Sequence, residues 1–318
     1  MKKILITGAL GQIGSELTMK MRDIYGNDNV IASSRSAKDG SEKVVKAGPF
    51  EIVDVTNPQQ IADAVKKHKI DTVINLAAIL SAVGESKPNL AWDVNMGGLV
   101  NILEVAREFN TAVFTPSSIA AFGPNTPKIN TPQDTIQRPT TMYGVTKVSG
   151  EILCDYYHQK FGVDTRGVRF PGLISYETLP GGGTTDYAVE IYYKAIEEGK
   201  FVCPLSKDTR MDMMYMPDAL DAIINLAEAD GSKLEHRNAF NVTAMSFTPE
   251  DIFASIKKQM PDFEMTYDVN DTLQNIADSW PDALDDSAAR KEWNWNPKYD
   301  LDAMTKDMLE KLKIKLGK

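Results

Sequence analysis

Tyr143 and Lys147 are the two residues whose types and spacing best suggest chemistry, because three residues separate them. On a helix, residues four positions apart lie on the same face, so the phenol and the ammonium would point into one site. A lysine ammonium beside a phenol stabilises the phenolate, which can take the proton of a substrate hydroxyl. The carbon that carries this hydroxyl would then give up a hydride. Because this spacing also arises by chance on solvated helices, other features of the chain have to support the interpretation.

A serine pair, Ser117 and Ser118, follows a predicted strand over residues 111–115. Hydroxyls at the carboxyl end of a parallel strand lie where open α/β sheets bind ligands. A serine there can donate a hydrogen bond to the substrate oxygen as it becomes a carbonyl. The alternative is that both serines satisfy backbone groups in a turn.

A glycine-rich turn near the start of the chain could hold a cofactor that accepts the hydride. A strand-like run, residues 2–7, precedes the turn, and a helix-like run, residues 15–22, follows it. Glycines let the backbone approach a pyrophosphate, and the helix N-terminus offers it free N–H groups. The predicted cofactor-binding residues of this turn are Gly8, Gly11, Gln12, Ile13 and Gly14. The alternative is a glycine-rich turn without a ligand.

The end of the next predicted strand, residues 30–33, bears on the choice of cofactor. An acidic residue there would hold the ribose 2′-hydroxyl of NAD, and an arginine would suit the 2′-phosphate of NADP. The chain has Ser34 and Arg35 and no carboxylate, which favours NADP. A serine can also bond a ribose hydroxyl, and Arg35 could be a solvated loop residue.

Later strands supply further cofactor contacts. Asp54 and Val55 follow a predicted strand, residues 50–53, and are placed to meet the adenine ring, although Asp54 could instead cap the helix predicted over residues 58–67. The strand over residues 72–76 leads into small residues that allow close approach. The contacts predicted here and at the end of the strand over residues 165–170 are Leu76, Ala77, Ala78 and Phe170.

Two polar residues in the segments that follow these strands are further candidates for the functional site. Ser81 could face the pocket. Asn95 lies near the start of a helix predicted over residues 92–109, where its amide could serve the site or bond backbone or water.

The alternation of strands and helices predicts an α/β fold with a doubly wound parallel sheet of the Rossmann type. We expect residues 1–172 to form the dinucleotide-binding domain with the Tyr-x-x-x-Lys pair. Residues 173–318 would form a smaller, mainly substrate-binding α/β region, with some segments returning to the Rossmann sheet.

The segment Pro180–Tyr187 contains three successive glycines, which suits a loop that closes over a ligand. Its Thr184 and Thr185 could instead form an ordinary helix N-cap cluster. Further along, the methionine-rich run Met211–Met216 is typical of core filling. Trp280 could be a core or interface aromatic.

Composition excludes several classes of function. The 318-residue chain has a net charge of −9, which argues against nucleic acid or an anionic membrane as a partner. Two cysteines without close spacing and three histidines suggest neither a disulfide framework nor a metal site. No signal peptide and no apolar run of roughly 20 residues is recognisable, so we expect a cytoplasmic protein.

Taken together, the glycine turn, the run Asn75–Ala78, the serine segment and Tyr-x-x-x-Lys resemble the extended short-chain dehydrogenase/reductase superfamily, and especially its sugar-nucleotide epimerases. Ser118 matches the catalytic serine segment of that superfamily. The second half is similar to the short-chain L-threonine 3-dehydrogenases in four segments: Pro180–Val189, Met213–Met216, Ala244–Pro249 and Ala277–Pro281.

This resemblance implies oxidation of the 3-hydroxyl of L-threonine to 2-amino-3-oxobutanoate with NAD, in threonine catabolism. It assigns the hydroxyl proton to Tyr143, the nicotinamide ribose to Lys147 and the reacting oxygen to Ser118. The remaining substrate contacts that it implies are Thr184 and Thr185 for the amino-acid head group, with Ser81 and Trp280 lining the pocket. It also implies a homodimer.

Ser34 departs from the pattern of the family, whose members usually carry aspartate there, so NAD is expected while NADP is not excluded. Two alternative functions stay open. A nucleotide-sugar epimerase or dehydratase would use the same three residues but needs a basic site, and the second half has little clustered arginine. A non-catalytic NAD(P)-sensing protein would typically lack the tyrosine or the lysine, and both are present here.

Overall fold

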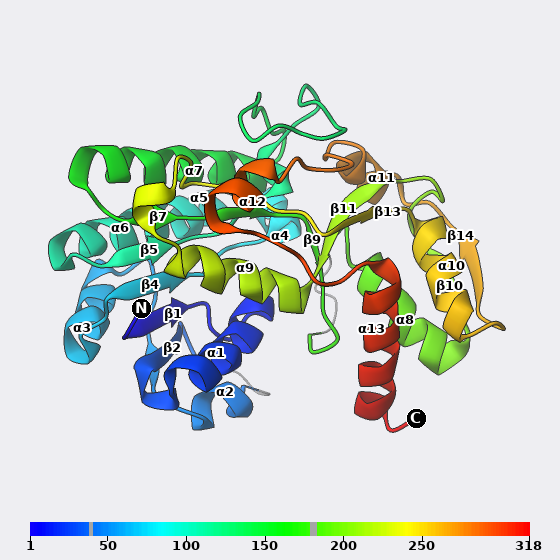
Figure 1. Cartoon of the computed structure of the whole chain (residues 1–318), viewed down its shortest axis with the longest axis horizontal. Helices are drawn as coiled ribbons and strands as arrows, with labels where there is room; N and C mark the ends of the chain where they lie inside the picture. Colours follow the sequence, from blue (N-terminus) through cyan, green and yellow to red (C-terminus); the bar gives the residue numbers. More distant parts are fainter. Residues whose placement is uncertain (38–40, 179–182) are drawn as a thin grey trace.

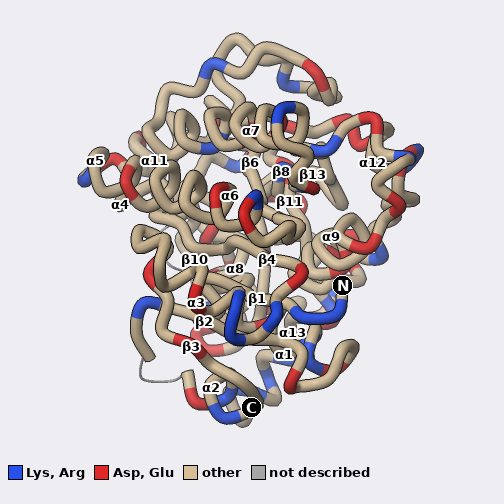
Figure 2. Tube along the Cα trace, turned by 90° about the vertical axis from the view of Figure 1, so that its left-hand side faces the viewer, with Lys and Arg blue, Asp and Glu red and all other residues tan. Residues whose placement is uncertain are grey.

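The computed structural model describes residues 1–37, 41–178 and 183–318. Of the closing loop that the sequence predicts over Pro180–Tyr187, residues 180–182 lie outside the described residues. Among the described residues, no helix combines the length and apolar character needed to span a bilayer. Figure 2 shows that basic and acidic residues both occur in the lower and in the upper part of the molecule.

Six parallel strands form the central sheet in the order β3-β2-β1-β4-β5-β7, as the prediction of a doubly wound α/β fold requires. Its strands are β1 (Ile4–Thr7), β2 (Val30–Ser34), β3 (Phe50–Ile52), β4 (Thr72–Asn75), β5 (Ala112–Phe114) and β7 (Thr165–Arg166). The apolar run Ile4–Ile6 is fully buried, because parallel strands with helices on both faces exclude water from either side.

Helices cover the two faces of this sheet (Figure 1). One face packs against α3 (Pro58–His68), α6 (Gly98–Phe109) and α7 (Met142–Phe161). The other packs against α1 (Gln12–Tyr25) and α9 (Met216–Glu228). Within β1, Leu5 contributes to the first core while Ile4 and Ile6 contribute to the second, as the alternation of side chains along a strand requires.

The second half of the chain adds smaller sheets and its own core. The remaining strands are β6 (Ser117–Ser118), β8 (Val168–Phe170), β9 (Gly172–Ile174), β10 (Lys200–Cys203), β11 (Met211–Tyr215), β12 (Phe240–Asn241), β13 (Met245–Phe247) and β14 (Glu264–Tyr267). They pair as β12-β8-β6, β13-β11-β9 and β10-β14. The core beside them is built around α8 (Tyr187–Glu198), α10 (Pro249–Gln259) and α13 (Leu301–Leu316).

Shorter helices complete the described chain. They are α2 (Glu42–Lys46), α4 (Ser81–Ser86), α5 (Pro88–Trp92), α11 (Asp271–Ala277) and α12 (Ser287–Trp293), with a π-helical turn η2 (Asp93–Gly97) and the 3₁₀ turns η1 (Asn27–Asn29), η3 (Ile119–Ala121) and η4 (Gly231–Lys233). The methionine-rich run Met211–Met216 forms the strand β11 and the first residue of α9, and its full burial confirms its predicted place in the core.

The strand predicted over residues 165–170 is wrong in one respect, because it breaks at Gly167 into β7 and β8. These two strands belong to different sheets. Gly167 donates its N–H to the Arg237 carbonyl at 2.9 Å. A Cβ at this position would lie 2.4 Å from the Thr115 carbonyl oxygen, so only glycine allows the chain to cross there.

Candidate functional site

A cavity of about 270 Å³ lies between the dinucleotide part and the second half of the chain. Residues predicted from distant parts of the sequence meet along its wall. They are Gly8, Gly11, Gln12, Ile13, Gly14, Leu76, Ala78, Ser118, Tyr143, Lys147, Phe170, Thr185 and Trp280. Predicted cofactor, reaction and substrate residues are therefore found together around one cavity.

The glycine turn forms one end of this cavity. Gly8 has φ +67°, and a Cβ on it would lie 2.7 Å from the Leu76 carbonyl carbon. A Cβ on Gly14 would lie 2.2 Å from the Gly8 oxygen, so both positions require glycine. Helix α1 begins after Gly11, which offers no side chain to cap it. Its first N–H groups suit a pyrophosphate, and the cradle fits a nicotinamide dinucleotide.

Tyr143 and Lys147 lie on one face of α7, at its N-terminal end. Thr141 caps this end by accepting the N–H of Gly144 at 3.1 Å. A Cβ on Gly144 would lie 2.2 Å from the Ala120 oxygen, so the helix start packs closely on the serine segment. Lys147 Nζ lies 5.3 Å from the centroid of the Tyr143 ring and donates to the Pro116 oxygen at 2.8 Å.

Ser118 can serve both as the cap of a turn and as a hydrogen-bond donor to a ligand, the two roles that its sequence position allows. Its Oγ accepts the N–H of Ala120 at 3.2 Å and so caps the turn η3. Because this bond uses Oγ as an acceptor, the hydroxyl proton stays available for a ligand oxygen in the cavity. The neighbouring Ser117 also lines the cavity, but its hydroxyl is buried and donates to Glu151.

The residues expected to contact the adenosine half do not line this cavity. Ser34 ends β2 and is half-buried, and Arg35 is exposed. Val55 is 3% exposed and packs against Gly98 of α6. The alternative that Asp54 caps α3 is wrong, because Asn57 caps this helix, while Asp54 Oδ1 accepts bonds from Thr56 in its own turn.

Asn95 bonds the backbone rather than facing the cavity. Its Oδ1 accepts the N–H of Ile79 at 2.7 Å, and its Nδ2 donates to the Ile79 oxygen at 3.1 Å and to Thr146 Oγ1 at 3.0 Å. Asn95 and Ala77 line a smaller cavity of about 50 Å³, which shares Lys147 with the main cavity. Ser81 begins α4, directly after Leu80, which lines the main cavity.

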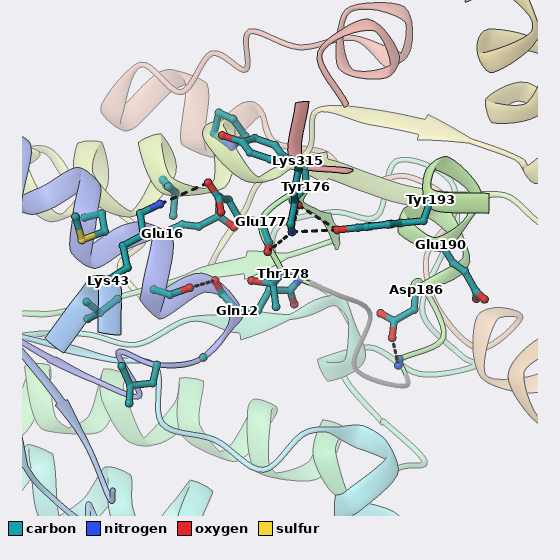
Figure 3. Close-up of a pocket in the computed structure, with 18 of the residues that line it drawn as sticks. Gln12, Glu16, Lys43, Tyr176, Glu177, Thr178, Asp186, Glu190, Tyr193 and Lys315 are labelled. Carbon is teal, nitrogen blue, oxygen red and sulfur yellow. Dashed lines mark hydrogen bonds and ion pairs between the residues drawn. The ribbon is translucent and has the colours of Figure 1, made fainter. Parts of the chain in front are cut away.

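A larger cleft of about 1580 Å³ adjoins the glycine turn (Figure 3). Gly11 and Gln12 line both spaces, and Thr184 lines the cleft. Ser175 Oγ donates to Glu16 Oε1 at 2.6 Å, and burial raises the pKa of Glu16 to about 7. Lys315 donates to the carbonyl oxygens of residues 176 and 177, both at 2.8 Å, which ties the end of α13 to this segment.

Trp280 and Thr185 form the opposite wall of the main cavity. Trp280 also packs against Ile119, Phe122 and Leu284, so this half-buried aromatic both covers a small apolar cluster and lines the cavity. A Cβ on Gly172 would lie 2.7 Å from Thr185 Cγ2, which shows how closely this threonine rests on the strand β9.

The wall therefore presents a phenol, an ammonium and a serine hydroxyl beside a cradle for a dinucleotide. An ionised phenol can accept the proton of an alcohol. A hydroxyl that donates a hydrogen bond can stabilise the substrate oxygen as the bond between this oxygen and carbon becomes a carbonyl double bond. This set suits hydride transfer between an alcohol carbon and a nicotinamide ring.

Comparisons with known proteins agree with this geometry. The model of the NAD dependent epimerase/dehydratase family matches residues 4–243. An uncharacterized epimerase/dehydratase from Staphylococcus saprophyticus is 60% identical over 316 residues, which cover 99% of this chain and 98% of the relative.

Several solved structures resemble the whole chain, among them two L-threonine dehydrogenases. L-threonine dehydrogenase from Clostridium difficile superposes with a TM-score of 0.98 at 65% identity, covering 99% of this chain and 98% of that one. L-threonine dehydrogenase from Phytophthora infestans superposes with a TM-score of 0.95 at 49% identity, covering 99% and 100%.

Proposed function

Because the chain belongs to the NAD dependent epimerase/dehydratase family, we propose that it oxidises the 3-hydroxyl of L-threonine to 2-amino-3-oxobutanoate. The observation that carries the proposal is the meeting of Ser118, Tyr143 and Lys147 with the glycine cradle in one cavity. The 65% identity to an L-threonine dehydrogenase supports the choice of substrate.

The residues around the cavity have separate roles in this reaction. Tyr143, as the phenolate, takes the proton of the 3-hydroxyl, and the positive charge of Lys147 stabilises the phenolate. Ser118 donates a hydrogen bond to the reacting oxygen as it becomes a carbonyl. The nicotinamide cofactor, when bound, accepts the hydride.

The substrate is held by residues from the second half of the chain. Thr184 and Thr185 bind the amino-acid head group, with Ser81 and Trp280 beside them. Thr185 and Trp280 line the main cavity and Thr184 lines the adjoining cleft, which supports this division. Exclusion of water from the cavity would strengthen the polar contacts made there.

The proposed cofactor is NAD, bound by the glycine turn and by the ends of the neighbouring strands. The match to a family described as NAD dependent supports this choice. The lack of a carboxylate at Ser34 leaves NADP as the alternative, with Arg35 as the residue that would bind its 2′-phosphate.

The test is reduction of NAD and of NADP by L-threonine, with L-serine and L-allo-threonine as controls. Rapid reduction of NAD by L-threonine supports the proposal. Reduction with NADP alone keeps the reaction and changes the cofactor. No reduction with either cofactor, in protein shown to be folded, contradicts the proposal.

The name of the family and of the staphylococcal relative favours a second candidate, a nucleotide-sugar epimerase or dehydratase. It would use the same Tyr143, Lys147 and Ser118. Its diphosphate substrate needs cationic partners, and no arginine is among the described residues that line the main cavity. Nucleotide-sugar retained through purification, measured by mass spectrometry, would favour this candidate.

A further inference from the structure

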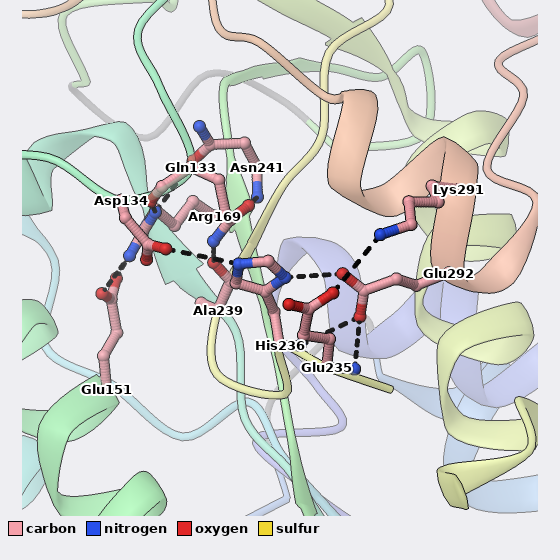
Figure 4. A network of polar contacts seen from close by, with 10 residues as sticks. All are labelled: Gln133, Asp134, Glu151, Arg169, Glu235, His236, Ala239, Asn241, Lys291 and Glu292. Carbon is pink, nitrogen blue, oxygen red and sulfur yellow. Dashed lines mark hydrogen bonds and ion pairs between the residues drawn. The ribbon is translucent and has the colours of Figure 1, made fainter. Parts of the chain in front are cut away.

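A buried ion pair joins Glu151 of α7 to Arg169 of β8 (Figure 4). Glu151 is 6% exposed and Arg169 is 5% exposed. Arg169 Nε donates to Glu151 Oε1 at 3.0 Å, and Arg169 Nη2 donates to Oε2 at 2.9 Å. Two such bonds fix both the position and the plane of the carboxylate. Because a buried pair is weak evidence for stability, its place next to the site calls for a functional explanation.

Glu151 continues the helical series of the reacting residues. Tyr143, Lys147 and Glu151 are spaced by four along α7 and therefore share one face of the helix. Lys147 and Glu151 both line the small cavity, which adjoins the main one at Lys147 and Ser117. The carboxylate is thus one helical turn beyond the ammonium.

Glu151 reaches the serine segment through Ser117. The buried Ser117 hydroxyl donates to Glu151 Oε1. One residue earlier, Lys147 donates to the Pro116 oxygen at 2.8 Å. Helix α7 therefore holds the segment that ends in Ser118 at two successive residues. Strand β8 holds the other edge, because Ser117 pairs with Arg169 in the parallel register of β6 and β8.

The remaining polar atoms of the ion pair are also engaged. Gln137 Nε2 donates to Glu151 Oε2 at 2.7 Å. Arg169 Nη1 donates to the Gln133 oxygen at 2.8 Å and to Asn241 Oδ1 at 3.0 Å. The carboxylate cannot turn away from Ser117 without breaking several of these bonds. The network of hydrogen bonds therefore fixes the position of Ser117.

We infer that Glu151, held by Arg169, is a positioning residue that acts through Ser117 to set the Ser118 hydroxyl against Tyr143. The inference rests on the proposed function, in which Ser118 and Tyr143 share the substrate oxygen. Small displacements of such groups reduce turnover more than they reduce binding, because alignment matters most in the transition state.

The first test is Ser117→Ala, which removes the link and leaves the ion pair intact. We expect kcat with L-threonine and NAD to fall about tenfold, with KM and the Kd for NAD within about twofold of wild type. Ser255→Ala is the matched control, because Ser255 is 3% exposed and donates to Asp302 Oδ1 at 2.7 Å, far from the site. Wild-type kcat in Ser117→Ala, or an equal loss in the control, would overturn the inference.

A double-mutant cycle tests whether Glu151 acts through Ser117. Glu151→Leu removes both oxygens that could accept the Ser117 hydroxyl, so it lowers kcat, and adding Ser117→Ala to it should change kcat by less than about twofold, because the link is already broken. Losses that multiply would show that Glu151 acts by another route. Circular dichroism establishes that each variant is folded, and if Glu151→Leu is not folded, the result for Ser117→Ala decides.

A crystal structure separates failure of the inference from failure of the proposed function. If wild type does not oxidise L-threonine, the proposed substrate is wrong, but the position of Ser118 can still be compared between wild type and Ser117→Ala. The inference expects a shift of the Ser118 hydroxyl relative to Tyr143. An unchanged position would overturn it.

Discussion

At the scale of single residues, Tyr143 is the group on which the proposed reaction depends. Tyr143→Phe removes the base and leaves the ring, so we expect kcat to fall by about 10³-fold while NAD binds as in wild type. Initial-rate kinetics and calorimetric titration with NAD measure the two quantities. Tyr156→Phe is the control, because Tyr156 lies on the same helix and is 51% exposed. Turnover at the wild-type level in Tyr143→Phe would exclude this tyrosine as the base.

Ser34 is the residue at which cofactor choice can be changed. Ser34→Asp places a carboxylate at the end of β2, where it accepts bonds from ribose hydroxyls and repels a 2′-phosphate. We expect kcat/KM for NADP to fall by about 10- to 100-fold, as a charged contact of this size implies, while the value for NAD is kept or rises.

A second experiment replaces Arg35, which is exposed at the end of the same strand, β2. If a 2′-phosphate binds there, Arg35→Gln should weaken the binding of NADP but not that of NAD, because only NADP carries the charge of this phosphate. Parallel kinetics with both cofactors give the comparison. Equal losses of kcat/KM for NAD and NADP in either variant would show that this strand end does not distinguish a 2′-hydroxyl from a 2′-phosphate.

At the scale of elements, a buried carboxyl joins β11 to the segment that carries Trp280. Asp212 is fully buried, and it accepts bonds from Thr243 Oγ1 at 2.6 Å and from the Leu284 N–H at 2.8 Å. Burial raises its pKa to about 8, although both bonds act in the opposite direction. Asp212 is therefore neutral in the folded protein at pH 6, and ionised when the chain is unfolded.

The sign of the resulting pH dependence follows from proton uptake on folding. Between the ordinary carboxyl pKa and about 8, the folded state binds one more proton at Asp212 than the unfolded state. The free energy of unfolding therefore falls as pH rises through this window. Asp212→Asn removes the effect, so the loss between pH 5 and 8 should shrink by about 4 kcal/mol, because a difference of one bound proton is worth about 1.4 kcal/mol for each pH unit. Denaturant titrations of both proteins at each pH measure it, and parallel curves would contradict the assignment.

At the scale of the whole molecule, we expect two copies of the chain to associate through α6 and α7. Large apolar side chains are exposed on these helices, including Val100 at 38%, Ile152 at 64% and Tyr156 at 51%. Exposed apolar groups that collect on adjacent elements are typical of protein interfaces. A dimer would also hold the helix that carries Tyr143 and Lys147.

Ile152→Glu tests this association, because a charge at the centre of an apolar contact has to lose its water. We expect wild type to run as a dimer, and the variant as a monomer, in gel filtration with light scattering. Ile314→Glu is the control, since Ile314 is 72% exposed on α13, away from these helices. A monomeric wild type, or dissociation in the control alone, would contradict the prediction.

Local rules were sufficient for several features of the fold and the site. Buried apolar runs such as Ile4–Ile6 specify strands of a parallel sheet, and the spacing of Tyr143 and Lys147 specifies a shared helical face. The glycine turn follows from what the backbone at Gly8 and Gly14 has to allow. Each of these depends on residues that are close together in the sequence.

Contacts between distant residues decided the rest. Glu151 meets Ser117 across 34 positions and Arg169 across 18, and Asp212 meets Leu284 across 72. No period or short motif marks such pairs, because each partner looks ordinary in its own segment. The break between β7 and β8 depends likewise on the Thr115 oxygen beside Gly167. The sequence by itself therefore determined the elements and the kind of chemistry, whereas only the tertiary structure decided which buried groups hold the reacting side chains in place.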